Sequence, residues 1–232
     1  MGLIPNPVLA ARRELSERYL EGAGVELGAL HQPLWTSERA TVRYIDRLDV
    51  AGLRLQYPEL AACDLVNVDI VDDGETLSSI EDGQLDFIIA NHMLEHAENP
   101  IGTIRNHLRK LRDNGVLYYA VPDKWAFFDR DRPITPFEHL VRDDREGATV
   151  SRLEHFQEWV RLVDKVTQPD EIECRVRHLL AINYSIHFHV WDDHHFMLFL
   201  ENANQYLGSP FRIEYFGQNL GEMISVLRKT SG

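Results

Sequence analysis

The stretch Asp86-Phe-Ile-Ile-Ala-Asn-His-Met-Leu-Glu-His96 decides the fold of this 232-residue chain. Residues 87–90 are apolar and β-leaning, which is typical of a strand buried on both faces in a parallel sheet. The run then changes at once to polar residues, beginning with Asn91 and His92. In an open α/β sheet, ligands bind outside the carboxyl ends of the strands. We therefore expect the chemistry of this protein to lie just after Ala90.

Similar short apolar segments flank this strand on both sides. They predict strands at 25–27, 41–45, 65–70 and 116–121, helices at 8–21 and 99–113, and a terminal pair of strands at 211–215 and 223–227. Pro100 suits the first turn of its helix, and Asn114-Gly115 ends it. Because strands and helices alternate, the pattern predicts an α/β protein with a doubly wound, mostly parallel sheet.

The alternation stops after Pro122. Residues 123–150 are dense in charge and interrupted by Pro133 and Pro136, and helices are predicted at 151–166 and 192–206. We predict a single domain over residues 1–232, in which residues 123–185 form an insertion or cap over the strand ends.

Bulk properties exclude several classes of partner. The net charge of −13 and a pI near 5.2 disfavour binding to nucleic acid, since no Lys/Arg run offsets them. No apolar run approaches 18 residues, and the amino terminus lacks a signal-peptide pattern, so we expect no membrane partner. Only two cysteines, Cys63 and Cys174, fit a reduced, cytoplasmic location. The sequence leaves the oligomeric state open, a homodimer included.

With Glu26-Leu27-Gly28 upstream and Val121-Pro122-Asp123 downstream, the opening stretch resembles class I S-adenosylmethionine-dependent methyltransferases. The resemblance covers residues 22–123 well and 185–230 loosely. It implies a Rossmann-like fold with a mostly parallel seven-stranded sheet and a helical insertion after the fifth strand. It also implies S-adenosyl-L-methionine as the cofactor.

The resemblance places the cofactor across the strand ends. Gly28 would let the backbone approach the methionine part of the ligand, and Glu26 would orient a water or the ammonium group. Asp46, which lies 18 residues beyond Gly28 (46 − 28), would accept hydrogen bonds from the ribose diol. The remaining predicted cofactor residues are Asp69 and Ile70 for the adenine, and Asn91 and His92 for the methionine end.

The glycine loop departs from the family pattern. It reads Glu26-Leu-Gly-Ala-Leu-His-Gln-Pro33, with one glycine where the family has two or three. Such a loop is a poor phosphate cradle, which disfavours a dinucleotide-binding oxidoreductase more than a methyltransferase.

Two phrases in the second half suggest the acceptor. Arg132-Pro-Ile-Thr-Pro-Phe-Glu-His-Leu140 and His187-Phe-His-Val-Trp191 resemble bacterial glycan methyltransferases, including those of mycobacterial methylated polysaccharides. This implies an O-methyltransferase acting on a sugar hydroxyl or a small polysaccharide precursor, hence a role in polysaccharide biosynthesis. Three aromatic residues could stack on a sugar ring, although core packing would explain them equally well: Trp125, Phe127 and Phe128.

Methyl transfer to oxygen needs in-line alignment and usually a general base. Asp123 and His139 are the predicted bases, and His96 is a third catalytic candidate whose alternative is a structural contact at the strand end. His187, His189 and Trp191 are expected to alternate along a strand, where a structural histidine is as plausible as a catalytic one.

A divalent ion such as Mg²⁺ is a further hypothesis, because some sugar methyltransferases use one to hold adjacent hydroxyls. The oxygen ligands would come from Asp143, Asp144, Asp192 and Asp193. The alternative is a solvated ion-pair face formed with Arg142 and Arg145.

Other functions stay open at this point. The acceptor could be a natural product or a lipid, with RNA disfavoured by the acidic surface. A protein that binds nucleotides without catalysis would keep the same fold.

Overall fold

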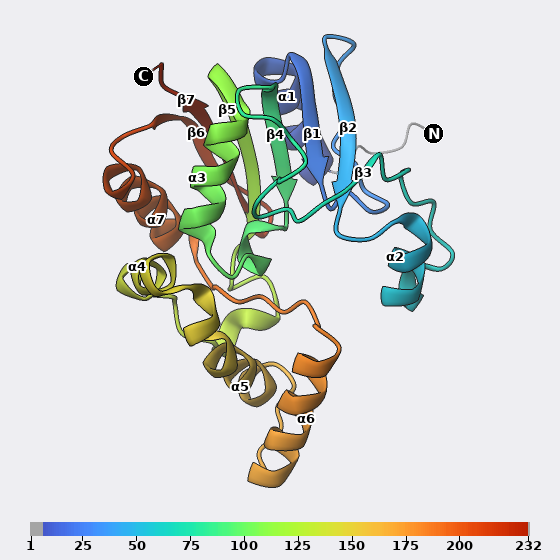
Figure 1. The fold of residues 1–232 in the computed structure, drawn as a ribbon, viewed down its shortest axis with the longest axis vertical. Coiled ribbons are helices and arrows are strands. Elements are labelled where there is room, and N and C mark those ends of the chain that lie inside the picture. The colour runs from blue at the N-terminus through green and yellow to red at the C-terminus, as the bar shows by residue number, and fades with distance from the viewer. Residues whose placement is uncertain (1–6, 232) are drawn as a thin grey trace.

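The computed structural model describes residues 7–231, which build one sheet flanked by helices (Figure 1). The strands are β1 (Gly22–Leu27), β2 (Ala40–Asp46), β3 (Ile70–Val71), β4 (Leu85–Asn91), β5 (Leu111–Pro122), β6 (Phe211–Asn219) and β7 (Glu222–Lys229). Their order in the sheet is β3-β2-β1-β4-β5-β7-β6. Strands β1 to β5 are parallel, whereas β7 runs antiparallel to both β5 and β6. The predicted α/β, Rossmann-like fold with seven strands is confirmed, and the sheet is mixed.

Helices cover both faces of the sheet. Within the described residues they are α1 (Pro7–Tyr19), α2 (Val50–Gln56), α3 (Pro100–Lys110), α4 (Phe137–Glu146), α5 (Arg152–Leu162), α6 (Pro169–Ala181) and α7 (Asp193–Tyr206). Short 3₁₀ turns occupy Pro58–Leu60, Leu94–His96, Phe128–Asp131 and Ala148–Val150. Among residues 7–231, no helix combines the length and the apolar character needed to cross a bilayer.

Strand β4 shows why this sheet is buried on both sides. Ile88 and Ala90 belong to the core that includes α3 and α7, whereas Phe87 and Ile89 pack in the core that includes Leu15 of α1. All four side chains are fully buried. Consecutive residues of a strand point to opposite faces, so a continuous apolar run is what a two-sided core requires.

Several predicted boundaries differ from the structure, and two of them are instructive. The third strand was expected at 65–70, but only Ile70–Val71 pair with β2. The carboxylate of Asp69 accepts the backbone N–H of Tyr44 at 2.8 Å, so a side chain replaces part of the strand ladder. The helix expected at 99–113 ends at Lys110, since Leu111 already pairs with Leu85.

The segment between β5 and α7 forms helices α4, α5 and α6, beyond the carboxyl ends of the parallel strands (Figure 1). It contains an apolar cluster of its own, to which α5 contributes Phe156 and Val160 and α6 contributes Val176 and Leu179. Phe188, from the segment that leads back to α7, completes this cluster. That the insertion binds the acceptor stays a prediction.

Candidate active site

The carboxyl ends of β1, β2 and β4 lie side by side, because Leu27 pairs with both Ile45 and Ala90. Gly28 follows with a φ of +63°, a left-handed conformation that favours glycine. A Cβ built at Gly28 would meet nothing within 4 Å. The turn after β1 therefore leaves open space at the strand end, as the predicted close approach of a ligand requires.

Glu26 and Asn91 form a buried polar pair at this edge. Glu26 is 1% exposed, and its two carboxylate oxygens accept the N–H of Leu34 at 2.9 and 3.0 Å. The amide of Asn91 donates to Glu26 at 3.2 Å, while its own carbonyl oxygen is buried without a partner. Burial raises the pKa of Glu26 to about 7, although these hydrogen bonds oppose the shift. A carboxylate beside an unpaired carbonyl oxygen is suited to a cationic donor such as an ammonium group.

Asp46 ends β2 next to this pair, half-buried. One of its oxygens accepts the N–H of Arg47 at 2.7 Å. Burial raises the pKa of Asp46, although this hydrogen bond and the charge of Arg47 lower it. The acidic residue predicted to bind the ribose diol thus lies at the strand end where it was expected.

The predicted adenine residues are placed differently. Asp69 is exposed and precedes β3, and its carboxylate accepts the backbone N–H of Tyr44. Ile70 lies within the strand. The acids at the carboxyl end of β3 are Asp72 and Asp73, and the N–H of Asp72 donates to the carbonyl of Asp46 at 3.0 Å. These two residues were missed because Asp72-Asp73-Gly74 is typical of a turn. Their position directly after a strand was the signal that could have identified them.

His92 ties the end of β4 to distant parts of the chain. Its backbone φ is +51°, and its Nε2 lies 2.9 Å from a carboxylate oxygen of Glu222 at the start of β7. Glu222 also accepts hydrogen bonds from Arg12 of α1 and from Asn219. Burial alone would raise the pKa of Glu222, but the hydrogen bond from His92 and the Arg12 guanidinium lower it to about 2. The carboxylate is therefore ionised at neutral pH.

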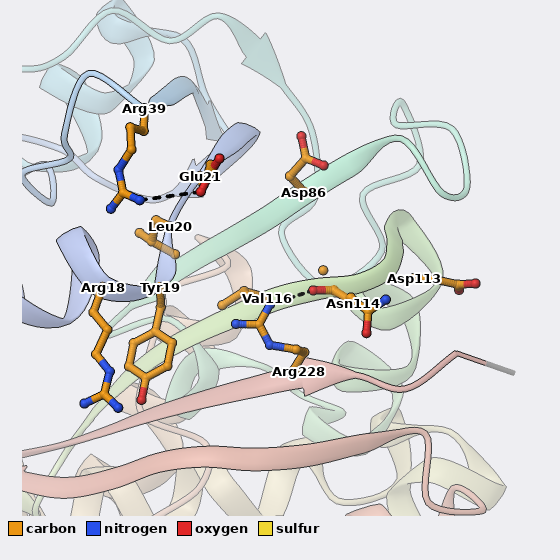
Figure 2. Close-up of a pocket in the computed structure, with 11 residues that line it drawn as sticks. Arg18, Tyr19, Leu20, Glu21, Arg39, Asp86, Asp113, Asn114, Val116 and Arg228 are labelled. Atoms are coloured by element: carbon orange, nitrogen blue, oxygen red, sulfur yellow. Dashed lines mark hydrogen bonds and ion pairs between the residues drawn. The ribbon is translucent and has the colours of Figure 1, made fainter.

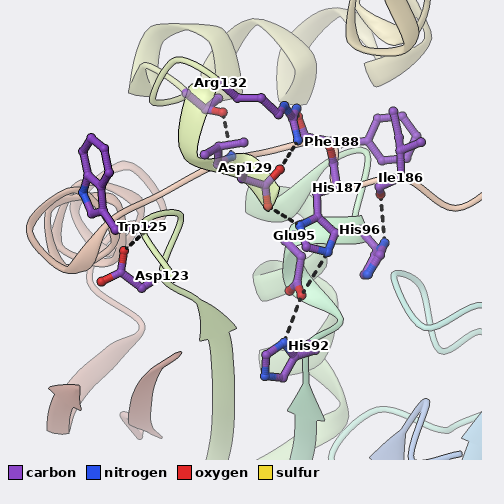
Figure 3. A network of polar contacts seen from close by, with 12 residues as sticks. His92, Glu95, His96, Asp123, Trp125, Asp129, Arg132, Ile186, His187 and Phe188 are labelled. Carbon is purple, nitrogen blue, oxygen red and sulfur yellow. Dashed lines mark hydrogen bonds and ion pairs between the residues drawn. The ribbon is translucent and has the colours of Figure 1, made fainter. Parts of the chain in front are cut away.

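A second histidine, His187, approaches the strand end from the insertion (Figure 3). Its Nδ1 lies 2.6 Å from Asp129, which also pairs with Arg132 at 2.8 Å. Its Nε2 faces Glu95, 3.9 Å away. Because Asp129 accepts the Nδ1 proton, the neutral imidazole keeps its lone pair on Nε2. We call His92, Glu95, Asp129, Arg132 and His187 the His187 network.

Glu95 is the acid at the centre of this network. It is 1% exposed, and neither carboxylate oxygen has a hydrogen-bond partner. Burial raises its pKa, while the charges of His187 and His92 oppose the shift. An unpaired buried carboxyl beside two imidazoles is typical of a site that holds or moves a proton.

Exposed aromatic rings border the network. The Phe127 ring lies 5.8 Å from that of His92, and the Phe128 ring lies 4.7 Å from that of His187, measured between centroids. Trp125, Phe127 and Phe128 are 54%, 39% and 49% exposed, so core packing does not account for them.

The three predicted catalytic residues occupy different surroundings. Asp123 accepts the N–H of Trp125 at 2.9 Å and is turned away from the His187 network (Figure 3). His96 packs edge-on against His187, and its Nδ1 lies 2.8 Å from the carbonyl of Ile186. Burial lowers the pKa of His96 to about 3, so it stays neutral. The structure brings His96 to the network, whereas His139 belongs to another group.

His139 lies in a second group, with His155 and His189. Each of the three offers one ring nitrogen, and these atoms lie within 4.8 Å of one another. The expected strand at 187–191 is wrong, because the N–H groups of Phe188 and His189 both donate to the carbonyl of Glu95 instead of to a neighbouring strand. Both histidines of this segment are buried.

The four aspartates proposed as Mg²⁺ ligands have separate partners. Asp144 pairs with Arg105 at 2.6 Å, and Asp192 caps α7 by accepting the N–H of His195. Asp143 is fully buried and accepts the hydroxyl of Ser151 at 2.8 Å. These carboxylates do not build the predicted site.

Two hollows lie away from the strand ends. One, of about 230 Å³, is at the opposite edge of the sheet, where Leu20, Asp86, Asn114 and Arg228 line it (Figure 2). The other, of about 310 Å³, lies between the 134–140 segment and α7. The edge that carries Glu26, Asp46 and the His187 network is thus distinct from both.

A family model described as "Methyltransferase domain" matches residues 50–204. Among similar solved structures is a chain of the complex between the Haloferax volcanii Trm112 methyltransferase activator and a putative methyltransferase, with a TM-score of 0.53, 12% identity, and coverage of 97% of this chain and 90% of that one. A putative methyltransferase of Bacillus halodurans C-125 has a TM-score of 0.50, 11% identity, and coverage of 96% and 99%. A Rhodobacter sphaeroides protein described as a putative Zn-dependent alcohol dehydrogenase has a TM-score of 0.53, 15% identity, and coverage of 99% and 100%. At these identities the likeness concerns the fold alone. No curated protein sequence matches.

Proposed function

Because the chain belongs to the family of S-adenosylmethionine-dependent methyltransferases, we propose that it methylates a hydroxyl group of a sugar or small polysaccharide precursor. One observation carries the acceptor class: the exposed rings of Phe127 and Phe128 lie against His92 and His187, and His187 is paired with the buried Asp129. Flat apolar rings stack on the apolar face of a pyranose, and an imidazole with a free lone pair can accept a hydroxyl proton.

The strand ends contain groups that fit the cofactor. Gly28 leaves open space for the backbone approach, and Glu26 with the unpaired Asn91 carbonyl suits the ammonium group. Asp46 is positioned to accept hydrogen bonds from the ribose diol. When bound, S-adenosylmethionine supplies an activated, electrophilic methyl group.

His187 is the base that the geometry favours. Asp129 fixes its Nδ1 proton, and Arg132 holds Asp129 from the other side, so the imidazole keeps one orientation. As the acceptor oxygen bonds to the methyl carbon, the bond from that carbon to the sulfonium sulfur would break and S-adenosylhomocysteine would leave, while the hydroxyl proton would go to Nε2 of His187. Glu95, facing the same nitrogen, stabilises the imidazolium that forms.

The bases predicted from the sequence are less well placed than His187 to accept the proton of the acceptor hydroxyl. His96 has a pKa of about 3 and its Nδ1 is engaged by a backbone carbonyl. Asp123 accepts a backbone N–H from Trp125. His139 lies against Asp143 and His155 instead of facing the aromatic rings. Their catalytic roles stay predictions.

The first test is calorimetric titration with S-adenosylhomocysteine, using the wild type and Asp46→Ala. We expect micromolar binding that the variant loses. The second step offers the enzyme S-adenosylmethionine with a panel of mono- and oligosaccharides, phenols and hydroxylated lipids, and detects the methylated product by mass spectrometry. Transfer to phenols or lipids but to no saccharide would overturn the acceptor class, and no cofactor binding would leave a non-catalytic α/β protein.

The remaining expectations concern the protein's surroundings. The expectation of a cytoplasmic location follows from cysteine content, that of no nucleic-acid partner from net charge, and that of no membrane partner from the lack of a long apolar run; homodimerisation stays open. They are proposals that fractionation and gel filtration would check.

A further inference from the structure

The group around His139 joins three segments of the chain between β5 and α7. His139 and Asp143 are one turn apart on α4, His155 lies on α5, and His189 lies on the extended segment before α7. We call these four residues the three-histidine cluster. His155, His189 and Asp143 are buried, and the His139 side chain is 20% exposed.

The distances in the cluster match a shared centre. His139 Nε2 lies 3.0 Å from His155 Nε2 and 3.0 Å from Asp143 Oδ2, and the latter two atoms are 4.0 Å apart. Ligands about 2.0–2.1 Å from a tetrahedral ion lie roughly 3.3 Å from each other. The three rings are steeply inclined to one another, at 89°, 84° and 66°, so they approach from different directions.

His189 provides an independent sign of a ligand. Its Nε2 lies 3.3 Å from the carbonyl of Glu98, so the ring proton is on that side. Its Nδ1 is buried and has no hydrogen-bond partner. Donation of one ring N–H to a backbone carbonyl, with the other nitrogen free, is the usual arrangement of a metal-bound histidine.

No arrangement of protons satisfies the cluster on its own. His139 Nε2 forms its hydrogen bond with His155, Asp143 Oδ2 is buried without a hydrogen-bond partner, and nothing donates to His189 Nδ1. A cation at the centre would meet all the lone pairs at once.

We propose that His139, Asp143, His155 and His189 bind one divalent transition-metal ion, for which Zn²⁺ fits best. Three imidazoles and one carboxylate suit zinc, and four protein ligands make a closed, structural site. The ion would join α4, α5 and the segment that carries His187 two residues before His189. This site is separate from the cofactor edge, and the inference does not depend on the acceptor.

The test measures metal content directly. Protein without a polyhistidine tag is purified from zinc-supplemented cells, desalted, and analysed by plasma mass spectrometry. The variants are His155→Gln and His189→Gln, and the control is His178→Gln, an exposed histidine on α6 of the same insertion. We expect one zinc per chain in the wild type and the control, and loss of the ion in both variants.

Two further measurements guard against misfolded variants. The wild type, stripped with a chelator, is titrated with Zn²⁺ against a chromophoric competitor, and separately with Co²⁺, whose tetrahedral complexes absorb strongly in the visible. Saturation at one equivalent with tetrahedral Co²⁺ absorption supports the site. Wild-type protein that holds no more metal than the His189→Gln variant, or that binds no zinc after stripping, overturns it. Neither readout uses methyl transfer, so failure here is distinguishable from failure of the proposed function.

Discussion

The His187 network and the three-histidine cluster lie in the same half of the molecule, yet their histidines have opposite surroundings. In the network, Nδ1 of His187 is held by a carboxylate and Nε2 faces Glu95. In the cluster, Nδ1 of His189 has no partner. The first group borders exposed aromatic rings, and the second lies on α4, α5 and the extended segment before α7. The comparison teaches that what the second ring nitrogen contacts decides which role a histidine suits: the first arrangement suits proton transfer, and the second suits ion binding.

The largest expected effect would come from breaking the network. His187→Ala should lower kcat by about 10²- to 10⁴-fold, the usual contribution of a general base. S-adenosylhomocysteine affinity should stay unchanged, because His187 is not one of the residues predicted to hold the cofactor. Steady-state kinetics and calorimetry measure both, with His194→Ala on the exposed start of α7 as the control. A kcat equal to that of the control would move the base elsewhere, with His96 and Asp123 next in line.

Loss of the ion from the three-histidine cluster should lower the stability of the protein instead of its rate constant. At a free zinc concentration of about 1,000 times Kd, the ion contributes roughly 4 kcal/mol to the free energy of unfolding. Chelation should therefore lower the midpoint of thermal unfolding by roughly 10 °C. Differential scanning calorimetry of the wild type and His155→Gln, each with and without chelator, checks this. Equal shifts in both proteins would mean that the chelator acts at another site.

The next prediction concerns Glu26, a predicted cofactor residue that belongs to neither histidine group. In the free protein its pKa is raised to about 7 from 4.5 by burial. Its contribution to stability is thus fully present below pH 4.5 and is lost as the pH rises through about 7. An ammonium group stabilises the ionised form, so binding near neutral pH should release a proton and tighten as the pH rises.

Calorimetry in buffers of different ionisation enthalpy measures that proton. Glu26→Gln should abolish the release and weaken S-adenosylhomocysteine binding by roughly tenfold to a hundredfold, as expected for a hydrogen bond to a charged group. Zinc content should be unaffected in this variant. Asp49→Asn, which removes an exposed acid that caps α2, is the control. A buffer-independent enthalpy in the wild type would contradict the assignment.

The smallest expected effect concerns the exposed aromatic rings beside the His187 network. Phe128→Ala should raise the KM for a saccharide acceptor by about three- to tenfold, the worth of one ring contact. Stability should change little, because the side chain is 49% exposed. Leu55→Ala, at a more exposed apolar position on α2, serves as the control. An unchanged KM would mean that the acceptor does not stack on this ring.

The sequence predicted the strands that bury continuous apolar runs and the common edge where Glu26, Gly28, Asp46 and Asn91 meet. It failed where side chains replace backbone partners, as Asp69 does at the start of β3. The apolar-polar alternation at 187–191 misled because the backbone of this segment bonds to Glu95, Thr135 and Lys124, which do not lie in strands.

The functional groupings were harder to predict, because their members are distant in the chain. His187 and Asp129 are 58 positions apart, and only the packing of the insertion brings them together. Part of the three-histidine cluster was recoverable. His139 and Asp143 have the four-residue spacing that places two ligands on one helix face, although the charged neighbours of Asp143 favoured an ion-pair interpretation.

The link from Arg12 through Glu222 to His92 has a consequence for protein synthesis. Arg12 is 210 positions from Glu222, and His92 is 130 positions from it. A growing polypeptide therefore cannot form the contact between His92 and Glu222 until the start of β7 has left the ribosome. Translation products that stop short of Glu222 would leave this histidine and the Arg12 guanidinium without their shared carboxylate, so these contacts form only once the start of β7 has been made.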